Sequence, residues 1–252
     1  MKRALTCLLL LYAVPAARGA EMTAYDLVDQ SNKALRGQSS HSRITMTITT
    51  PKWERTLSIE GWNQGREKAL MRIHGPAKER GNRTLKISKE IWNWLPSVER
   101  VIKIPPSMMQ ASWMGSDFTY EDMVKADSIV KDYTHKIVEK SAEGSRVVYK
   151  IVAAPKPEAP VVWGTVVLIV GVEDGRVIPV KEEDFSERGE HMRTLEFSDV
   201  KTMGGRRIPT RLECRPLRKP ENKTVITYQQ FDVDVPFGKD FFGLSNLQKP
   251  LK

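Results

Sequence analysis

The segment RITMTIT, residues 43–49, alternates polar and apolar side chains with a period of two. Successive side chains of an extended strand point to opposite sides, so Ile44, Met46 and Ile48 share one face while the arginine and threonines share the other. Such alternation is typical of a strand that packs one face on a core and leaves the other in water. The segment therefore predicts one strand of a sheet with a single covered face.

The same period continues along the chain, beginning with Leu57 and Ile59 in the next segment. Further short runs of this kind are separated by turns that contain Gly, Pro or Asn. They lie at residues 69–73, 85–87, 92–94, 102–104, 133–138, 147–152, 161–170, 177–183, 192–200, 208–214 and 225–233. Short strands joined by short turns predict an antiparallel meander of about a dozen strands.

Two segments in this series need a separate interpretation. The apolar run VVWGTVVLIVG, residues 161–171, is too short to span a bilayer, so we expect a central strand buried on both faces. Proline-rich APKPEAP, residues 154–160, precedes it. Because strands of the same style lie on both sides of this segment, we expect a long loop within one sheet. Ahead of all the strands, Thr23 caps a predicted amphipathic helix that ends at Gly37.

The chain begins MKRALTCLLLLYAVPAARGA, in which two basic residues precede a short apolar run that ends in small residues. This pattern is typical of a cleaved secretion signal. We expect the signal to comprise residues 1–19, although cleavage after Ala17 or Ala20 fits nearly as well. Residues 20–252 are then expected to form a single domain, soluble and, in a Gram-negative bacterium, periplasmic.

The charge of the mature chain is positive. Without Lys2, Arg3 and Arg18, the 40 basic residues become 37 against 31 acidic ones, a net charge of +6. Such an excess suits contact with anionic lipid headgroups or an acidic partner, and it equally suits a surface that keeps the protein in solution. We expect transient contact with a membrane and no nucleic-acid partner.

Cys214 is the one cysteine that remains after removal of the signal, and it cannot form an intramolecular disulfide. It continues an alternation with Ile208, Thr210 and Leu212, which indicates a buried position. We therefore expect an unreactive core thiol and a monomeric protein.

Motifs of catalysis and metal binding are not found in the sequence. His41, His74, His135 and His191 are scattered, without the spacing of metal ligands, and there is no nucleophile elbow, phosphate loop or dinucleotide motif. We expect no metal, no cofactor and no enzyme activity. The acidic cluster of Asp117, Glu121 and Asp122 could serve in glycoside cleavage, but stabilisation of a helix N-terminus explains it more simply.

The segment MMQASWMGSDFTYEDM, residues 108–123, gathers four methionines and three aromatic residues around that acidic cluster. Flexible methionine side chains suit a surface that accommodates variable apolar partners, and they also suit the core of an ordinary helix. Trp92 and Trp94 raise a similar pair of alternatives, because Ile91 and Leu95 make the opposite face of their strand apolar too. A sheet with two apolar faces needs two covers, and a ligand can supply part of one.

Four segments together resemble a known family: GSDFTYEDM (115–123), IWNWLPSVERVIKI (91–104), RRIPTRLECRP (206–216) and VDVPFGKDFF (233–242). They are similar to the LolA-like outer-membrane lipoprotein-sorting proteins over nearly the whole mature chain. The resemblance implies a mainly β fold with some α structure, an incomplete, half-open antiparallel β-barrel curled around a few helices. It also implies an apolar cavity for the acyl chains of lipids or lipoproteins, which the protein carries between the inner and outer membranes, with an inner-membrane exporter of the RND type as a partner.

On this interpretation, the ligand-binding residues lie on the concave wall and on a lid formed by a helix in the methionine-rich segment. The expected wall residues are Ile44, Met46, Ile48, Leu57, Ile59, Met71, Trp92 and Trp94, and the expected lid residues are Phe118, Tyr120 and Met123. A slip of one residue in any strand would reverse its assignment. The alternative function is that of a non-carrier periplasmic module, filled by its own side chains, that docks an exporter or envelope partner through Arg100, Lys103, Arg206 and Arg207.

Overall fold

Thirteen strands form one antiparallel sheet in the computed structural model, which describes residues 21–249. They are β1 (Ser39–Thr49), β2 (Glu54–Gln64), β3 (Lys68–Gly75), β4 (Arg83–Ile87), β5 (Glu90–Leu95), β6 (Arg100–Lys103), β7 (Tyr133–Glu143), β8 (Arg146–Pro155), β9 (Val166–Glu173), β10 (Arg176–Phe185), β11 (His191–Met203), β12 (Arg206–Pro216) and β13 (Lys223–Val233). The predicted signal peptide, residues 1–19, lies outside the described residues.

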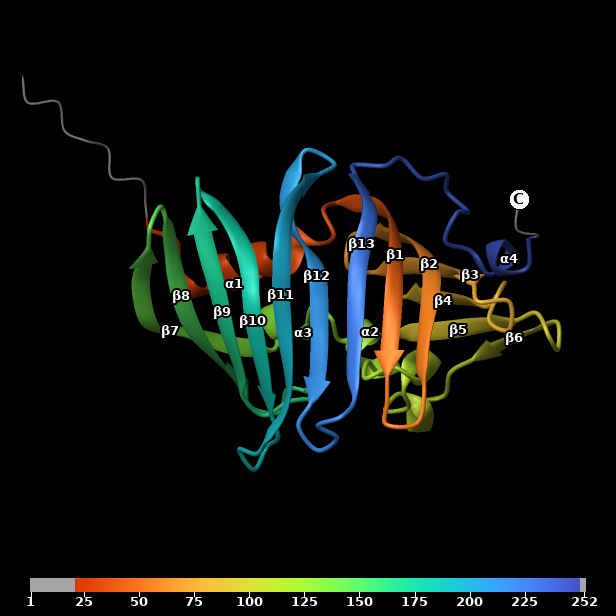
Figure 1. Ribbon diagram of the computed structural model, residues 1–252, viewed down its shortest axis with the longest axis horizontal. Helices are drawn as coiled ribbons and strands as arrows, with labels where there is room; N and C mark the ends of the chain where they lie inside the picture. The colour runs from red at the N-terminus through yellow and green to blue at the C-terminus, as the bar shows by residue number, and fades with distance from the viewer. Residues whose placement is uncertain (1–20, 250–252) are drawn as a thin grey trace, which may run out of the picture.

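The sheet consists of two meanders joined in the middle (Figure 1). Strands β1 to β6 follow one another on one side and β7 to β13 on the other, and β1 pairs with β13 where the two halves meet. Strands β6 and β7 are therefore the two edges of an open, curled sheet. This confirms the predicted half-open antiparallel barrel with few helices.

Short helices cover the sheet. They are α1 (Ala24–Ala34), α2 (Tyr120–Val124), α3 (Ser128–Lys131) and α4 (Leu244–Leu247), with 3-10 turns η1 (Pro106–Met108) and η2 (Trp113–Gly115). Helix α1 crosses behind the strands of the β7–β11 half in Figure 1, while α4 lies at the opposite end of the molecule. The predicted N-terminal helix is confirmed. Thr23 accepts a hydrogen bond from the Asp26 amide at 3.1 Å, and the Thr23 amide donates to the Asp26 carboxylate at 3.0 Å.

Strand β1 shows the alternation that its sequence predicts. Met46 and Ile48 are buried and Ile44 is half-buried, whereas Arg43 on the other face is exposed. Met46 lies opposite Leu57 of β2 and opposite Ile226 of β13, so the covered faces of three strands are in register. The buried sides of both halves therefore join into one concave apolar face.

Two expectations are wrong in detail. Strand β9 begins only at Val166, and Val166, Leu168 and Val170 are buried while Val167 and Ile169 are half-buried, so the strand is covered on one face rather than two. The reason is that α1 packs against the concave side of this half of the sheet.

The predicted lid helix is also shorter than expected. Thr119 caps α2, so Phe118 precedes the helix. The expected loop at residues 154–160 does join two paired strands, β8 and β9.

Cys214 is fully buried, as its alternation with Ile208 and Thr210 predicts. Burial raises the pKa of its thiol to about 12.

Because the thiolate is the reactive form of cysteine, we expect no labelling of Cys214 in the folded protein by 5,5′-dithiobis(2-nitrobenzoate) at pH 8. One equivalent per mature chain should react after denaturation in guanidinium chloride. Rapid labelling of the native protein would contradict the buried placement.

Candidate functional site

Two separate apolar clusters cover the concave face. Helix α1 contributes Leu27 and Val28 to the first, where they pack on β7 to β10. The second lies on β1 to β5 under the segment 104–124, which contributes Trp113 and Tyr120. We call residues 104–124 the covering segment.

The covering segment is tied to the sheet beneath it by a chain of polar contacts. Trp113 donates from Nε1 to the Thr84 hydroxyl at 3.0 Å, and Thr84 donates to Asn93 at 2.8 Å. Asn93 in turn donates to the Tyr120 hydroxyl at 2.7 Å. Each of these buried polar groups is thereby satisfied, which fixes the segment over β4 and β5.

A cavity of about 410 Å³ lies between the two clusters, within the range of ligand pockets. Its walls include members of both clusters and three apolar side chains of β11 and β12 that belong to neither: Leu195, Phe197 and Leu212. The apolar lining includes Ile44, Met71, Trp113, Phe118, Met123, Ile129, Trp163, Val166, Leu168, Leu195, Phe197, Leu212 and Ile226. The middle of the concave face is thus a cavity that side chains do not fill, with an apolar part and with charged residues such as Lys86, Glu182 and Arg193 in its wall.

The structure divides the predicted binding residues into three groups. Ile44 and Met71 from the wall, and Phe118 and Met123 from the covering segment, line the cavity. The others predicted for the concave side, Met46, Ile48, Leu57, Ile59 and Tyr120, are packed in the second cluster under the covering segment. They support the wall and leave its surface to other residues.

Trp92 and Trp94 lie on the opposite face of the sheet, so their predicted place on the concave wall is wrong. They pack in a third cluster with Phe237, Phe241 and Phe242 of the C-terminal segment. Ile91, the neighbour of Trp92 on β5, packs in the second cluster on the concave side. Both faces of β5 are apolar because both are covered, one by residues 104–124 and one by the C-terminal segment.

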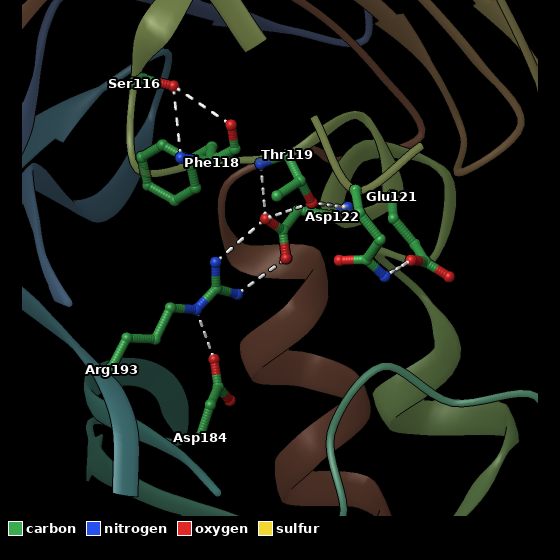
Figure 2. Close-up of polar contacts among 8 residues, drawn as sticks. Ser116, Phe118, Thr119, Glu121, Asp122, Asp184 and Arg193 are labelled. Carbon is green, nitrogen blue, oxygen red and sulfur yellow. Dashed lines mark hydrogen bonds and ion pairs between the residues drawn. The ribbon is translucent and has the colours of Figure 1, made fainter. Parts of the chain in front are cut away.

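Sequence reasoning missed a buried ionic network at the cavity wall. Arg193 of β11 donates through Nη1 and Nη2 to the Asp122 carboxylate at 3.0 and 2.8 Å, and through Nε to Asp184 of β10 at 2.6 Å. Figure 2 shows the guanidinium between the two carboxylates. The guanidinium also lies 4.7 Å from the ring centre of Trp163. The sequence signal for this network is the alternation of β11, in which the charged Arg193 lies two residues before the apolar Leu195 and therefore on the same face.

The acidic cluster has structural partners for each member. Asp122 closes a capping box with Thr119, accepting from its amide at 2.7 Å, in agreement with the expected role at a helix start. Asp117 is not part of the cap: it accepts from the Thr224 hydroxyl at 2.7 Å, and burial raises the pKa of its carboxyl. Glu121 pairs with Lys125 one turn later. No set of three or more His, Cys, Asp or Glu side chains within residues 21–249 is placed to hold a metal ion.

Glu182 lies in the cavity wall beside this network. Its side chain is half-buried, and desolvation together with the neighbouring Asp184 raises the pKa of Glu182 to about 8. Burial also raises the pKa of Asp184, while Arg193 opposes that rise. A protonated Glu182 avoids adding a further negative charge to one arginine that already pairs with two carboxylates.

We expect Asp122→Asn to destabilise the protein. Removing one partner of a buried ion pair costs about 3–5 kcal/mol, and because Arg193 keeps Asp184 we expect about 3 kcal/mol. Urea denaturation at pH 7 measures the loss. Glu121→Gln is the matched control on the same helix, where breaking a helical ion pair should cost under about 1 kcal/mol. Equal losses in the two variants would contradict the role assigned to the network.

Glu182 should make stability fall as pH rises. An unfolded glutamate ionises near pH 4.5, whereas Glu182 in the folded protein ionises near pH 8. Between these values the folded state binds the extra proton, so the free energy of unfolding decreases with increasing pH. We expect Glu182→Gln to make this decrease smaller, measured by urea denaturation at pH 5, 6, 7 and 8, while the raised pKa values of Asp117 and Asp184 leave part of it. Glu183→Gln, on the next residue of the strand and paired with Lys181, should keep the slope of the natural protein.

Comparison with known proteins identifies the fold. A family described as "Uncharacterized protein" has a model that matches residues 65–249. No curated protein matches the chain. Within the described part of the chain, no helix combines the length and the apolar character needed to cross a membrane.

Three solved structures are similar over most of their length. A DUF1329 family protein from Desulfovibrio piger ATCC 29098 has 22% identity and a TM-score of 0.78, covering 89% of this chain and 98% of that one. A LolA superfamily protein from Nitrosomonas europaea has 19% identity and a TM-score of 0.73, covering 90% and 100%. A domain from Vibrio parahaemolyticus, assigned as an outer membrane lipoprotein-sorting protein, has 17% identity and a TM-score of 0.71, covering 90% and 98%. The chain therefore belongs to the family whose model matches residues 65–249, and it has the LolA-like fold.

Proposed function

We propose that the protein is a carrier that binds the acyl chains of lipids or lipoproteins in the cavity between the two apolar clusters. The observation that carries this proposal is the unfilled space itself, because an apolar cavity of about 410 Å³ separates two otherwise well-packed halves of the concave face. Ile44, Met71, Phe197, Leu212 and Ile226 line it while only half-buried, so they have apolar surface left for a ligand.

Acyl chains of ordinary length suit such a site energetically. Burying each methylene contributes about 0.8 kcal/mol. Micromolar affinity requires about 8 kcal/mol net, and association costs at least about 4 kcal/mol. About fifteen buried methylenes therefore suffice, which is the length of one membrane-lipid chain. Binding alone accounts for this function, and no catalytic step is part of the proposal.

The covering segment acts as the lid in this proposal. Phe118 and Met123 lie over the cavity, whereas Trp113 and Tyr120 anchor the segment to β4 and β5. Met114 has a φ of 53°, a conformation that a non-glycine residue adopts rarely. Exchange of the contacts of Phe118 and Met123 for lipid contacts would admit cargo while Trp113 and Tyr120 stay packed in the second cluster.

The carrier is proposed to work in the periplasm as a monomer, after cleavage of residues 1–19, with residues 20–252 as one domain. Support comes from the fold shared with the Vibrio domain assigned to lipoprotein sorting. An inner-membrane exporter of the RND type is the proposed donor, and transient membrane contact accompanies loading and release. Arg100 and Lys103 on the edge strand β6 offer basic side chains for such contacts, with the Lys103 ammonium 5.5 Å from the ring centre of Trp92.

Filling the cavity tests the proposal. We expect Leu212→Trp to weaken binding of a fluorescent fatty acid, cis-parinaric acid, at least tenfold. The larger side chain excludes two or three methylenes, each contributing about 0.8 kcal/mol. Titration of the delipidated protein by fluorescence measures the change. The control is Leu217→Trp, an exposed position just beyond β12, which should bind as the natural protein does.

Two results would overturn the carrier function. One is the absence of probe binding at micromolar concentration by a folded, delipidated sample, which would favour the docking module instead. The other is equal binding by Leu212→Trp and the natural protein, which would place the probe outside the cavity. If the natural protein binds the probe in the cavity, organic extraction of the purified protein followed by mass spectrometry would identify the lipid class that it carries.

A further inference from the structure

Basic side chains gather where three elements meet at one part of the cavity wall. Arg36 follows the end of α1, Arg66 lies in the turn between β2 and β3, and Lys86 lies on β4. Arg66 pairs with Asp29 of α1 at 2.6 Å, and Lys86 donates to the main-chain oxygen of Arg66 at 2.6 Å. These contacts hold the three elements together and place the basic groups in one neighbourhood.

Lys86 is unusual for its burial. The residue is only 5% exposed and lines the cavity, yet its ammonium donates to a single neutral oxygen among the described residues. A buried ammonium with three donors and no paired carboxylate is costly. Burial and the nearby Arg36 lower the pKa of Lys86 to about 8.

Arg36 also lacks a partner. Its side chain lines the cavity but makes no hydrogen bond or ion pair with residues 21–249 in the structure. Burial, and to a lesser degree the nearby Arg66, lower the pKa of Arg36. Two cations from different elements therefore line the same space, and neither makes an ion pair with a carboxylate within residues 21–249.

The surrounding carboxylates are already committed. Asp29 is shared by Lys33 and Arg66, and Asp127 pairs with Lys131 at 2.5 Å. Glu182 is protonated at neutral pH, because its pKa is about 8. Glu67 is an exposed residue of the same turn as Arg66. Arg36 and Lys86 therefore have no ion-pair partner within residues 21–249 and can pair with an anion that enters the cavity.

We propose that Arg36 and Lys86 form a headgroup subsite, and that the cargo is an anionic amphiphile whose phosphate group lies between these cations while its acyl chain occupies the apolar part of the cavity. This assignment rests on the carrier function proposed above. Phosphate fits better than carboxylate, because a guanidinium fork takes two oxygens and a phosphate leaves another for the ammonium. Desolvation inside the cavity strengthens these contacts relative to those of a surface site.

Two probes that differ only in their headgroup test the assignment. Isothermal titration calorimetry of the full mature chain would use dodecyl phosphate and dodecanol below their aggregation concentrations, with inorganic phosphate as a third titrant. We expect the natural protein to bind dodecyl phosphate at least tenfold more tightly than dodecanol, since the phosphate accepts charge-assisted hydrogen bonds from both cations and a hydroxyl group does not. Arg36→Gln and Lys86→Met should each reduce that ratio about tenfold, with dodecanol binding unchanged.

Matched variants separate a local subsite from general charge. Arg176→Gln and Lys201→Gln remove exposed cations far from the lining and should leave the ratio within twofold of the natural protein. Arg36→Lys keeps a cation and should retain most of the preference. Thermal denaturation verifies folding, and because Arg36 is half-buried and makes no ion pair within residues 21–249, Arg36→Gln is expected to fold.

Each remaining outcome has a defined meaning. An unchanged ratio in folded Arg36→Gln overturns the subsite while leaving the carrier function intact. Tight binding of inorganic phosphate, equal to that of dodecyl phosphate, overturns the headgroup assignment in favour of a free-anion site. Failure of both dodecyl probes to bind overturns the carrier function itself, and with it the subsite.

Discussion

The pairing of β1 with β13 is the constraint on which the architecture depends. It joins an early and a late part of the chain, so that two local meanders become one sheet with its free edges at β6 and β7. Ile44 and Met46 lie opposite Tyr228 and Ile226 across this seam, which places the apolar sides of both halves on one concave face. An open curled sheet cannot fill that face with its own side chains, so other segments must cover it.

The covers come from two separate parts of the chain, and this explains why the core is divided. Helix α1 covers β7 to β10, and the covering segment covers β1 to β5. The ion pair between Arg193 and Asp122 connects the covering segment to the far half of the sheet across the cavity wall. Because Arg193 is buried, separating it from Asp122 would leave a buried charge with one partner fewer, and this cost disfavours positions of the covering segment that break the pair.

Local patterns predicted the strands, the first helix and the burial of Cys214, because period and capping depend on nearby residues. The face of β5 was beyond such reasoning: Ile91 and Trp92 are both apolar, and only the distant C-terminal segment determines which side Trp92 packs against. Ile44 and Met46 share a face, yet only Ile44 reaches the cavity, because the covering segment buries Met46. The alternation of β11 indicates that Arg193 is buried, but local patterns do not identify its partner, because Asp122 is 71 residues earlier in the chain.

The cavity itself is the strongest argument for a ligand. Its apolar lining leaves hydrophobic surface in contact with water, which a folded chain normally buries because each Å² of apolar surface removed from water contributes about 25 cal/mol. Chains readily fill such space with larger side chains, yet Ile44, Leu212 and Ile226 leave it open. Lys86, which is buried without a carboxylate partner among the described residues, adds a further cost in the same place. One anionic acyl compound would offset both, since its chain fills the apolar space and its headgroup neutralises the cations.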